Sequence, residues 1–200
     1  RPCLGQWYDL GSFAVLPSSL LREKKTPGEL VLSLKDTYFA PCLDEAPDYA
    51  SVQSRLELCA SKLFFEAAEG LPSSRRADCL ELMGKRIALV SAVLSLRLKK
   101  IYQWGDEKIL PFVEKALASS SGSLRQEVRK AEGFVSDRLR QIRSASSAEP
   151  SVETCERKLE QAFFAWIASR FHRDYHSVYC VVCSLWLLYG QIKNLVKMIE

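Results

Sequence analysis

Apolar residues recur three or four positions apart along most of the chain that follows Asp48, and this spacing places them on one side of an α-helix. Gly70 and Pro72 end the first such run, and Gly105 ends the second. The second run begins at about residue 73 and carries apolar residues on two faces, so we expect this helix to lie at the centre of the fold. The sequence therefore predicts an all-α fold, a helical bundle of about four main helices with an N-terminal wrap of loops and short helices.

The N-terminal part differs in composition from the rest of the chain. Residues 1–49 hold five of the eight prolines, which disfavour long helices. We therefore expect residues 1–49 to form a wrapping segment that packs on the bundle, and residues 50–200 to form the bundle itself. At 200 residues the chain is long enough to bury a core as a single domain overall.

One short helix is expected within the wrapping segment. The run Thr26-Pro27-Gly28-Glu29 has the form of a capping box, with the threonine as the cap and the proline at the first helical position. The helix should continue to about Lys35. Leucines alternate with other residues from 30 to 34, however, so a β-strand remains an alternative for this run.

Two further helices are predicted between Gly105 and Pro150. The first is short, and we expect it to be entered at Pro111, since proline is common at the first helical position. The second carries a narrow apolar stripe among many basic residues, which indicates a peripheral helix. The stripe consists of Leu124, Val128, Ala131, Val135, Leu139 and Ile142.

The last fifty residues, 151–200, read as almost one uninterrupted helical segment. Its most apolar run covers residues 178–189, about twelve residues, which is short of the roughly eighteen that suggest a transmembrane helix. We therefore expect no transmembrane segment and a buried core helix instead. The residues expected to pack into the bundle are Leu159, Phe163, Trp166, Ile167, Phe171, Val178, Val182, Leu185, Leu188 and Ile192.

Both histidines of the chain fall in this segment. In one continuous helix, His172, His176, Cys180 and Cys183 would lie within roughly an 80° arc of one face. The two histidines can share a zinc or iron ion if a third ligand comes from another helix, whereas Cys180 is about 12 Å along the axis from His172. Arg173 replaces the glutamate of a zincin motif. A metal site at His172 and His176 is therefore kept only as an alternative, and we expect no cofactor and buried, apolar cysteines.

The chain has seven cysteines, an odd and rather high number. Cys3 and Cys42 lie near the two ends of the wrapping segment, so a disulfide between them is a candidate. A bridge from Cys155 would have to reach Cys59 or Cys79 on another helix. The cysteine content weakly favours an oxidising compartment, so the expected location is extracellular (a secreted protein) or an organelle lumen, although the chain has no N-glycosylation sequon.

The charge distribution does not indicate a nucleic-acid partner. The net charge is +4, and neither a reading-helix motif nor basic residues interleaved with aromatics are visible. The nucleophile elbow, the Walker loop and the dinucleotide-binding glycine pattern are also missing from the sequence. We therefore expect no nucleic-acid binding and no enzymatic activity.

Two non-enzymatic functions are the leading candidates for this chain. The first is an interaction module, an adaptor, secreted effector or small subunit of a larger assembly, that binds a protein partner through Trp166, Tyr175, Tyr179 and Trp186. Aromatic residues at helical spacing are more often core than binding residues, so both roles stay open for them. The second is a carrier of an apolar ligand or lipid between helices. A cavity lined by Phe163, Trp166 and Tyr179 would favour the carrier, and a filled core with exposed aromatic residues would favour the interaction module.

Overall fold

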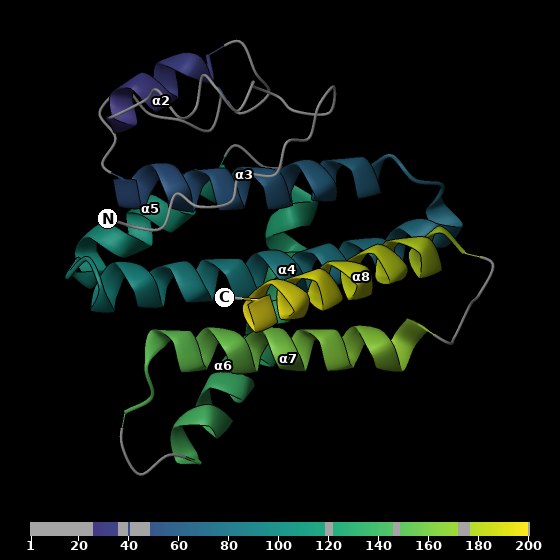
Figure 1. Ribbon diagram of the computed structural model, residues 1–200. Helices are drawn as coiled ribbons and strands as arrows, with labels where there is room; N and C mark the ends of the chain where they lie inside the picture. The colour runs from purple at the N-terminus through teal and green to yellow at the C-terminus, as the bar shows by residue number, and fades with distance from the viewer. Residues whose placement is uncertain are drawn as a thin grey trace. The chain divides into compact units, whose positions relative to one another are not determined.

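The computed structural model describes residues 26–35, 40, 49–118, 122–145, 149–171 and 177–199. These residues form helices and no strand, which confirms the all-α prediction. The chain divides into two compact units, Arg1–Ala60 and Ser61–Glu200, and the boundary falls inside a helix. The described helices, labelled in Figure 1, are α2 (Pro27–Ser33), α3 (Tyr49–Glu69), α4 (Ser73–Lys100), α5 (Asp106–Ala118), α6 (Gly122–Ser144), α7 (Val152–Phe171) and α8 (Val178–Ile199).

Helix α2, in the first unit, begins as the capping motif predicts. The backbone N–H of Glu29 donates to the hydroxyl oxygen of Thr26 at 3.2 Å, and Pro27 is the first helical residue. The helix ends at Ser33, two residues before the expected end, and the Ser33 hydroxyl donates to the Glu29 carbonyl at 2.9 Å. The strand alternative for this run is therefore wrong.

Helix α4 is the centre of the second unit, as its two apolar faces predict. It packs against α5, α6, α7 and α8. Leu82, Ile87 and Leu94 are almost completely buried. At 100° per residue Leu82 lies about 120–140° around the helix from Ile87 and Leu94, so neighbouring helices must cover α4 from more than one direction.

Helix α5 begins earlier than the sequence suggests. The Gly105 carbonyl accepts a hydrogen bond from the Ile109 N–H at 3.1 Å, which starts the helix at Asp106 and leaves Pro111 inside it. The prediction of entry at Pro111 is therefore wrong. Two acidic residues in the first turn favour the earlier start, because negative charge there interacts well with the helix dipole.

Helix α6 makes the most extensive packing with α4 of any described pair, and it runs across α4 and α7 in the view of Figure 1. Its predicted apolar stripe is confirmed, with Leu124, Val128, Ala131 and Val135 buried. The two helices approach closely at Gly84, where an added Cβ would lie only 2.8 Å from the Cβ of Glu127. The sequence predicts a peripheral helix here, and in the structure α6 is more central to the packing than that.

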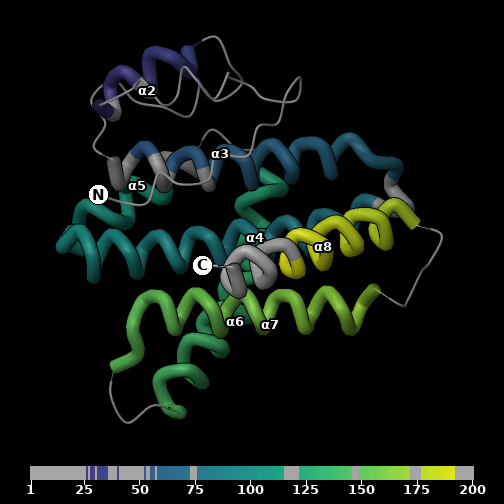
Figure 2. The backbone as a smooth tube through the Cα atoms, viewed as in Figure 1, coloured from purple at the N-terminus to yellow at the C-terminus, as the bar shows by residue number. Residues whose placement is uncertain are grey.

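The single helix expected over residues 151–200 is two helices in the structure. Helix α7 ends at Phe171, and α8 begins at Val178 and lies beside α7 (Figures 1 and 2). The pair is antiparallel, since Phe163, eight residues before the end of α7, contacts Trp186, eight residues after the start of α8. Ser177 is the physical reason for the new start, because its hydroxyl accepts a hydrogen bond from the Cys180 N–H at 3.2 Å and so caps α8.

The close approach at Gly84 gives a stability prediction. Gly84→Ala should lower the free energy of unfolding by about 1–3 kcal/mol, because the new methyl group must push α6 away from α4. The matched control is Gly133→Ala on α6, where nothing lies within 4 Å of the new methyl group. The control should raise stability by up to about 1 kcal/mol through helix propensity. Urea unfolding followed by circular dichroism measures both, and equal effects of the two variants would contradict the close contact.

Candidate functional site

An aromatic cluster joins α7 and α8 on the side that faces α4. The Phe163 ring is fully buried and is stacked on Trp166 with ring centroids 6.3 Å apart. Trp186 meets Phe163 edge-on at 5.8 Å and Tyr189 edge-on at 5.7 Å. Phe163 is therefore the packing centre of this cluster, and the tryptophans lie around it.

Cations hold Trp166 in place. The Lys85 ammonium lies 4.9 Å from the centre of the Trp166 ring, and the Arg170 guanidinium lies 5.0 Å from it. Both cations also pair with the Glu81 carboxylate, at 3.1 Å and 2.8 Å respectively. Trp166 was predicted to bind a partner. In the structure its half-buried ring instead contacts two cations of the same chain.

Trp186 has a similar cation beside it. The Arg86 guanidinium lies 5.0 Å from the Trp186 ring and 5.9 Å from the Phe163 ring. It also pairs with Glu160, with 3.9 Å between the guanidinium nitrogen and the carboxylate oxygen. Trp186 is half-buried, so one part of it belongs to the cluster and another part reaches the surface.

Tyr179 and three cysteines are buried between α4 and α8. Only 6% of Tyr179 is exposed, and Cys79 and Cys183 are almost fully buried. Burial raises the pKa of the Cys183 thiol to about 11, and neighbouring Cys180 and Cys79 also raise it. Burial is also the main cause that raises the pKa of Cys79, and the negative charge of neighbouring Asp78 raises it further. The buried, apolar character expected for Cys180 and Cys183 is confirmed, and the Cys183 thiol, with its raised pKa, is neutral at physiological pH.

The opposite side of α8 is apolar but exposed. We call this surface the α8 outer face, and at 100° per residue its members occupy an arc of about 100° opposite Cys183. Leu185 is 61% exposed and Leu188 is 52% exposed. The face consists of Val178, Val181, Leu185, Leu188 and Tyr189.

This exposure corrects the packing expected from the sequence. Val178, Leu185 and Leu188 were expected to pack into the bundle, and in the structure they point away from it. The inward positions are taken by Tyr179, Cys183 and their neighbours. Because both sides of α8 are apolar, the periodicity alone does not decide which side is buried.

Phe64, in the part of α3 that belongs to the second unit, extends the exposed apolar surface. It is 58% exposed, and its ring meets Trp186 edge-on with centroids 6.4 Å apart. Trp186 therefore connects the buried aromatic cluster to an exposed phenylalanine. Phe64 does not stand out in the sequence as a surface residue, because it shares a helical stripe with core residues.

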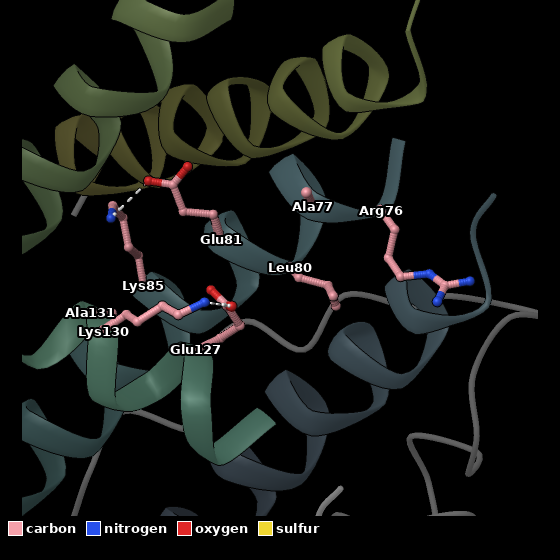
Figure 3. A pocket seen from close by; sticks show the side chains of 8 residues that line it. All are labelled: Arg76, Ala77, Leu80, Glu81, Lys85, Glu127, Lys130 and Ala131. Atoms are coloured by element: carbon pink, nitrogen blue, oxygen red, sulfur yellow. Dashed lines mark hydrogen bonds and ion pairs between the residues drawn. The ribbon is translucent and has the colours of Figure 1, made fainter. Parts of the chain in front are cut away.

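An open cleft of about 610 Å³ lies between α4 and α6 (Figure 3). Two ion pairs occupy it, Glu81 with Lys85 at 3.1 Å and Glu127 with Lys130 at 2.5 Å. Arg76 extends away from both pairs in Figure 3. The remaining lining is supplied by Ala77, Leu80 and Ala131. This cleft is charged, and it is not the aromatic cavity that a carrier of apolar ligands would need.

Several predicted site residues lie outside the described residues. These are Tyr175, His172 and His176 between α7 and α8, and Cys3 and Cys42 in the N-terminal part. Within the ranges that the structure describes, no group of three or more histidine, cysteine or acidic residues is placed to hold a metal ion. The metal and disulfide predictions for these residues therefore remain predictions.

The described cysteines do not bridge one another. Cys79, Cys155, Cys180 and Cys183 are free thiols, so the bridge from Cys155 to Cys59 or Cys79 is not formed. Cys59 is disulfide-bonded, and its partner is not among the described residues. In the described ranges, no helix combines the length and apolarity that crossing a membrane requires.

Comparison with protein families, with curated proteins and with solved structures finds no match to this chain.

The buried thiols give a pH prediction. A folded-state pKa raised from 9.0 to about 11 at Cys183 stabilises the protein fully below pH 9, and this stability is lost as the pH rises towards 11. Unfolding free energy should therefore fall by roughly 1–3 kcal/mol over that window. Cys183→Ala should flatten this decline, although it lowers stability at neutral pH by leaving a small cavity. Urea titrations at several pH values measure the slope, and an unchanged slope in the variant would contradict the assignment.

Proposed function

We propose that this chain is a non-enzymatic helical interaction module that binds another protein chain through the α8 outer face. The observation that carries the proposal is a continuous row of exposed aliphatic side chains on a helix whose other side is firmly packed. Soluble proteins rarely expose such a row unless it meets a partner. Adaptor, secreted effector and small subunit of an assembly are all compatible with this role.

The construction of α8 supports the proposal. Its inner side is anchored by Tyr179, Cys183 and Trp186, so the outer face is presented on a rigid element. Rigid presentation lowers the entropy lost on binding. A partner that covers Leu185 and Leu188 would gain on the order of 1.5–3 kcal/mol for each side chain that it buries completely.

The carrier of an apolar ligand has less support. It needs a cavity lined by Phe163, Trp166 and Tyr179, and in the structure Phe163 and Tyr179 are buried against other side chains. Trp166 is held between Lys85 and Arg170. The aromatic residues thus fill the space that a ligand would occupy.

The secreted or lumenal location remains part of the proposal. Its support is the high cysteine content and the disulfide at Cys59. The free thiols at four described cysteines count against a full disulfide framework. Because these thiols are buried, they are protected from oxidation in either compartment.

A capture experiment with matched variants tests the interaction surface. Leu185→Glu places a charge at the middle of the α8 outer face and should reduce protein partners captured from an extract by tenfold or more, since burying an unpaired charge is costly. The control is Leu110→Glu on α5, where the side chain is 64% exposed. The control should capture the same partners as the wild type.

Quantitative mass spectrometry after cross-linking gives the measurement, and circular dichroism confirms that both variants are folded. If Leu185→Glu and the wild type capture the same proteins to the same extent, then the α8 outer face is not the binding surface.

A further inference from the structure

The exposed residues of the α8 outer face have the spacing of a coiled-coil seam. Val178, Val181, Leu185 and Leu188 are separated by three, four and three positions, as the a and d positions of a heptad repeat are. The sequence of α8 continues the same spacing through Ile192, Leu195 and Ile199. The pattern therefore covers three heptads, close to the length at which such a repeat indicates a coiled coil.

The positions that flank this seam carry no charge along the part whose side chains are described. They are Val182 and Tyr189 on one side and Ser184 and Gln191 on the other. In coiled coils, charges at these e and g positions select a partner of complementary charge and exclude others. Because these e and g positions are uncharged, no like charges would repel an identical helix, and no charge on them requires a partner of a different sequence.

We propose that the occupant of the α8 outer face is α8 of a second copy of this chain, paired with it as a two-stranded coiled coil in a symmetric dimer. This inference rests on the proposed function and names its partner. A symmetric interface requires a surface that is complementary to itself, and an a/d seam meets this requirement because the knobs and holes of both helices are alike.

The available area sets the strength of the dimer. From Val178 to Tyr189 the α8 outer face is about 18 Å long, and a seam about 10 Å wide then covers on the order of 180 Å² per copy. This is below the roughly 800 Å² per partner of a standard interface, even with Phe64 and Tyr189 at its edge. The dimer should therefore be weak and should dissociate on dilution.

Sedimentation equilibrium of the purified full chain at several concentrations tests this pairing. The wild type should change from monomer to dimer as its concentration rises. Leu185→Glu should remain monomeric over the same range, with its helix content unchanged by circular dichroism. Leu110→Glu, on α5, should behave as the wild type does.

A charge-pairing experiment keeps the test independent of folding defects. Leu185→Glu and Leu185→Lys should each be monomeric, and an equimolar mixture should recover part of the dimer, because opposite charges then meet across the seam. A misfolded variant would not recover in this way.

Two outcomes would overturn the pairing. The first is a wild type that stays monomeric at its highest soluble concentration, and the second is a Leu185→Glu variant that dimerises as the wild type does. If the wild type stays monomeric but still captures a different protein, or binds phospholipid vesicles, in a manner lost in Leu185→Glu, the second copy is rejected as the occupant. Capture of a protein in that case would leave the proposed function standing, and binding of vesicles alone would reject both.

Discussion

Burial of α4 on more than one side is the constraint on which the second unit depends. Leu82, Ile87 and Leu94 can leave water only if several helices surround α4, and α5, α6, α7 and α8 do so. The close approach at Gly84 lets the α6 backbone come near enough to cover one side. The inner side of α8 helps to cover another, and the side chains of its outer face are left exposed.

Ion pairs between α4 and α7 determine the relative orientation of the two helices more than they stabilise the contact between them. Arg97 pairs with Glu156 at 2.7 Å, and Arg170 pairs with Glu81 at 2.8 Å. These pairs run in opposite sequence directions, so they favour an antiparallel arrangement of the two helices. As partly exposed pairs they contribute about 1 kcal/mol or less each, whereas the buried aromatic cluster contributes several times more.

Most helices could be predicted from the sequence, because their signals are local. The cap at Thr26, the stop at Gly70 and the apolar stripe of α6 depend on neighbouring residues, and the structure confirms all three. The start at Ser177 was missed, since a serine within a polar run resembles an ordinary exposed helix residue. Its role became visible only from the hydrogen bond to Cys180.

The candidate site could be predicted only in part. The sequence singles out the C-terminal segment, and within it favours the aromatic residues for binding and the aliphatic ones for the core. In the structure Tyr179 is buried and Leu185 is exposed. Both sides of α8 are apolar, so the choice between them depends on the shape of the surface that α4 and α7 offer, which no local pattern records. Small Cys183 fits this surface, and the large Trp186 fills its edge.

The central claim is that the α8 outer face is open to solvent in the folded monomer and becomes covered only by a partner. Hydroxyl-radical footprinting of the wild type at low and high concentration tests this most directly, with side-chain labelling normalised to the unfolded protein. At low concentration Leu185 and Leu188 should be labelled strongly while Phe163 and Tyr179 are protected, and at high concentration the two leucines should become protected. Protection of both leucines at every concentration would mean that the chain covers this face itself, and the account would be wrong.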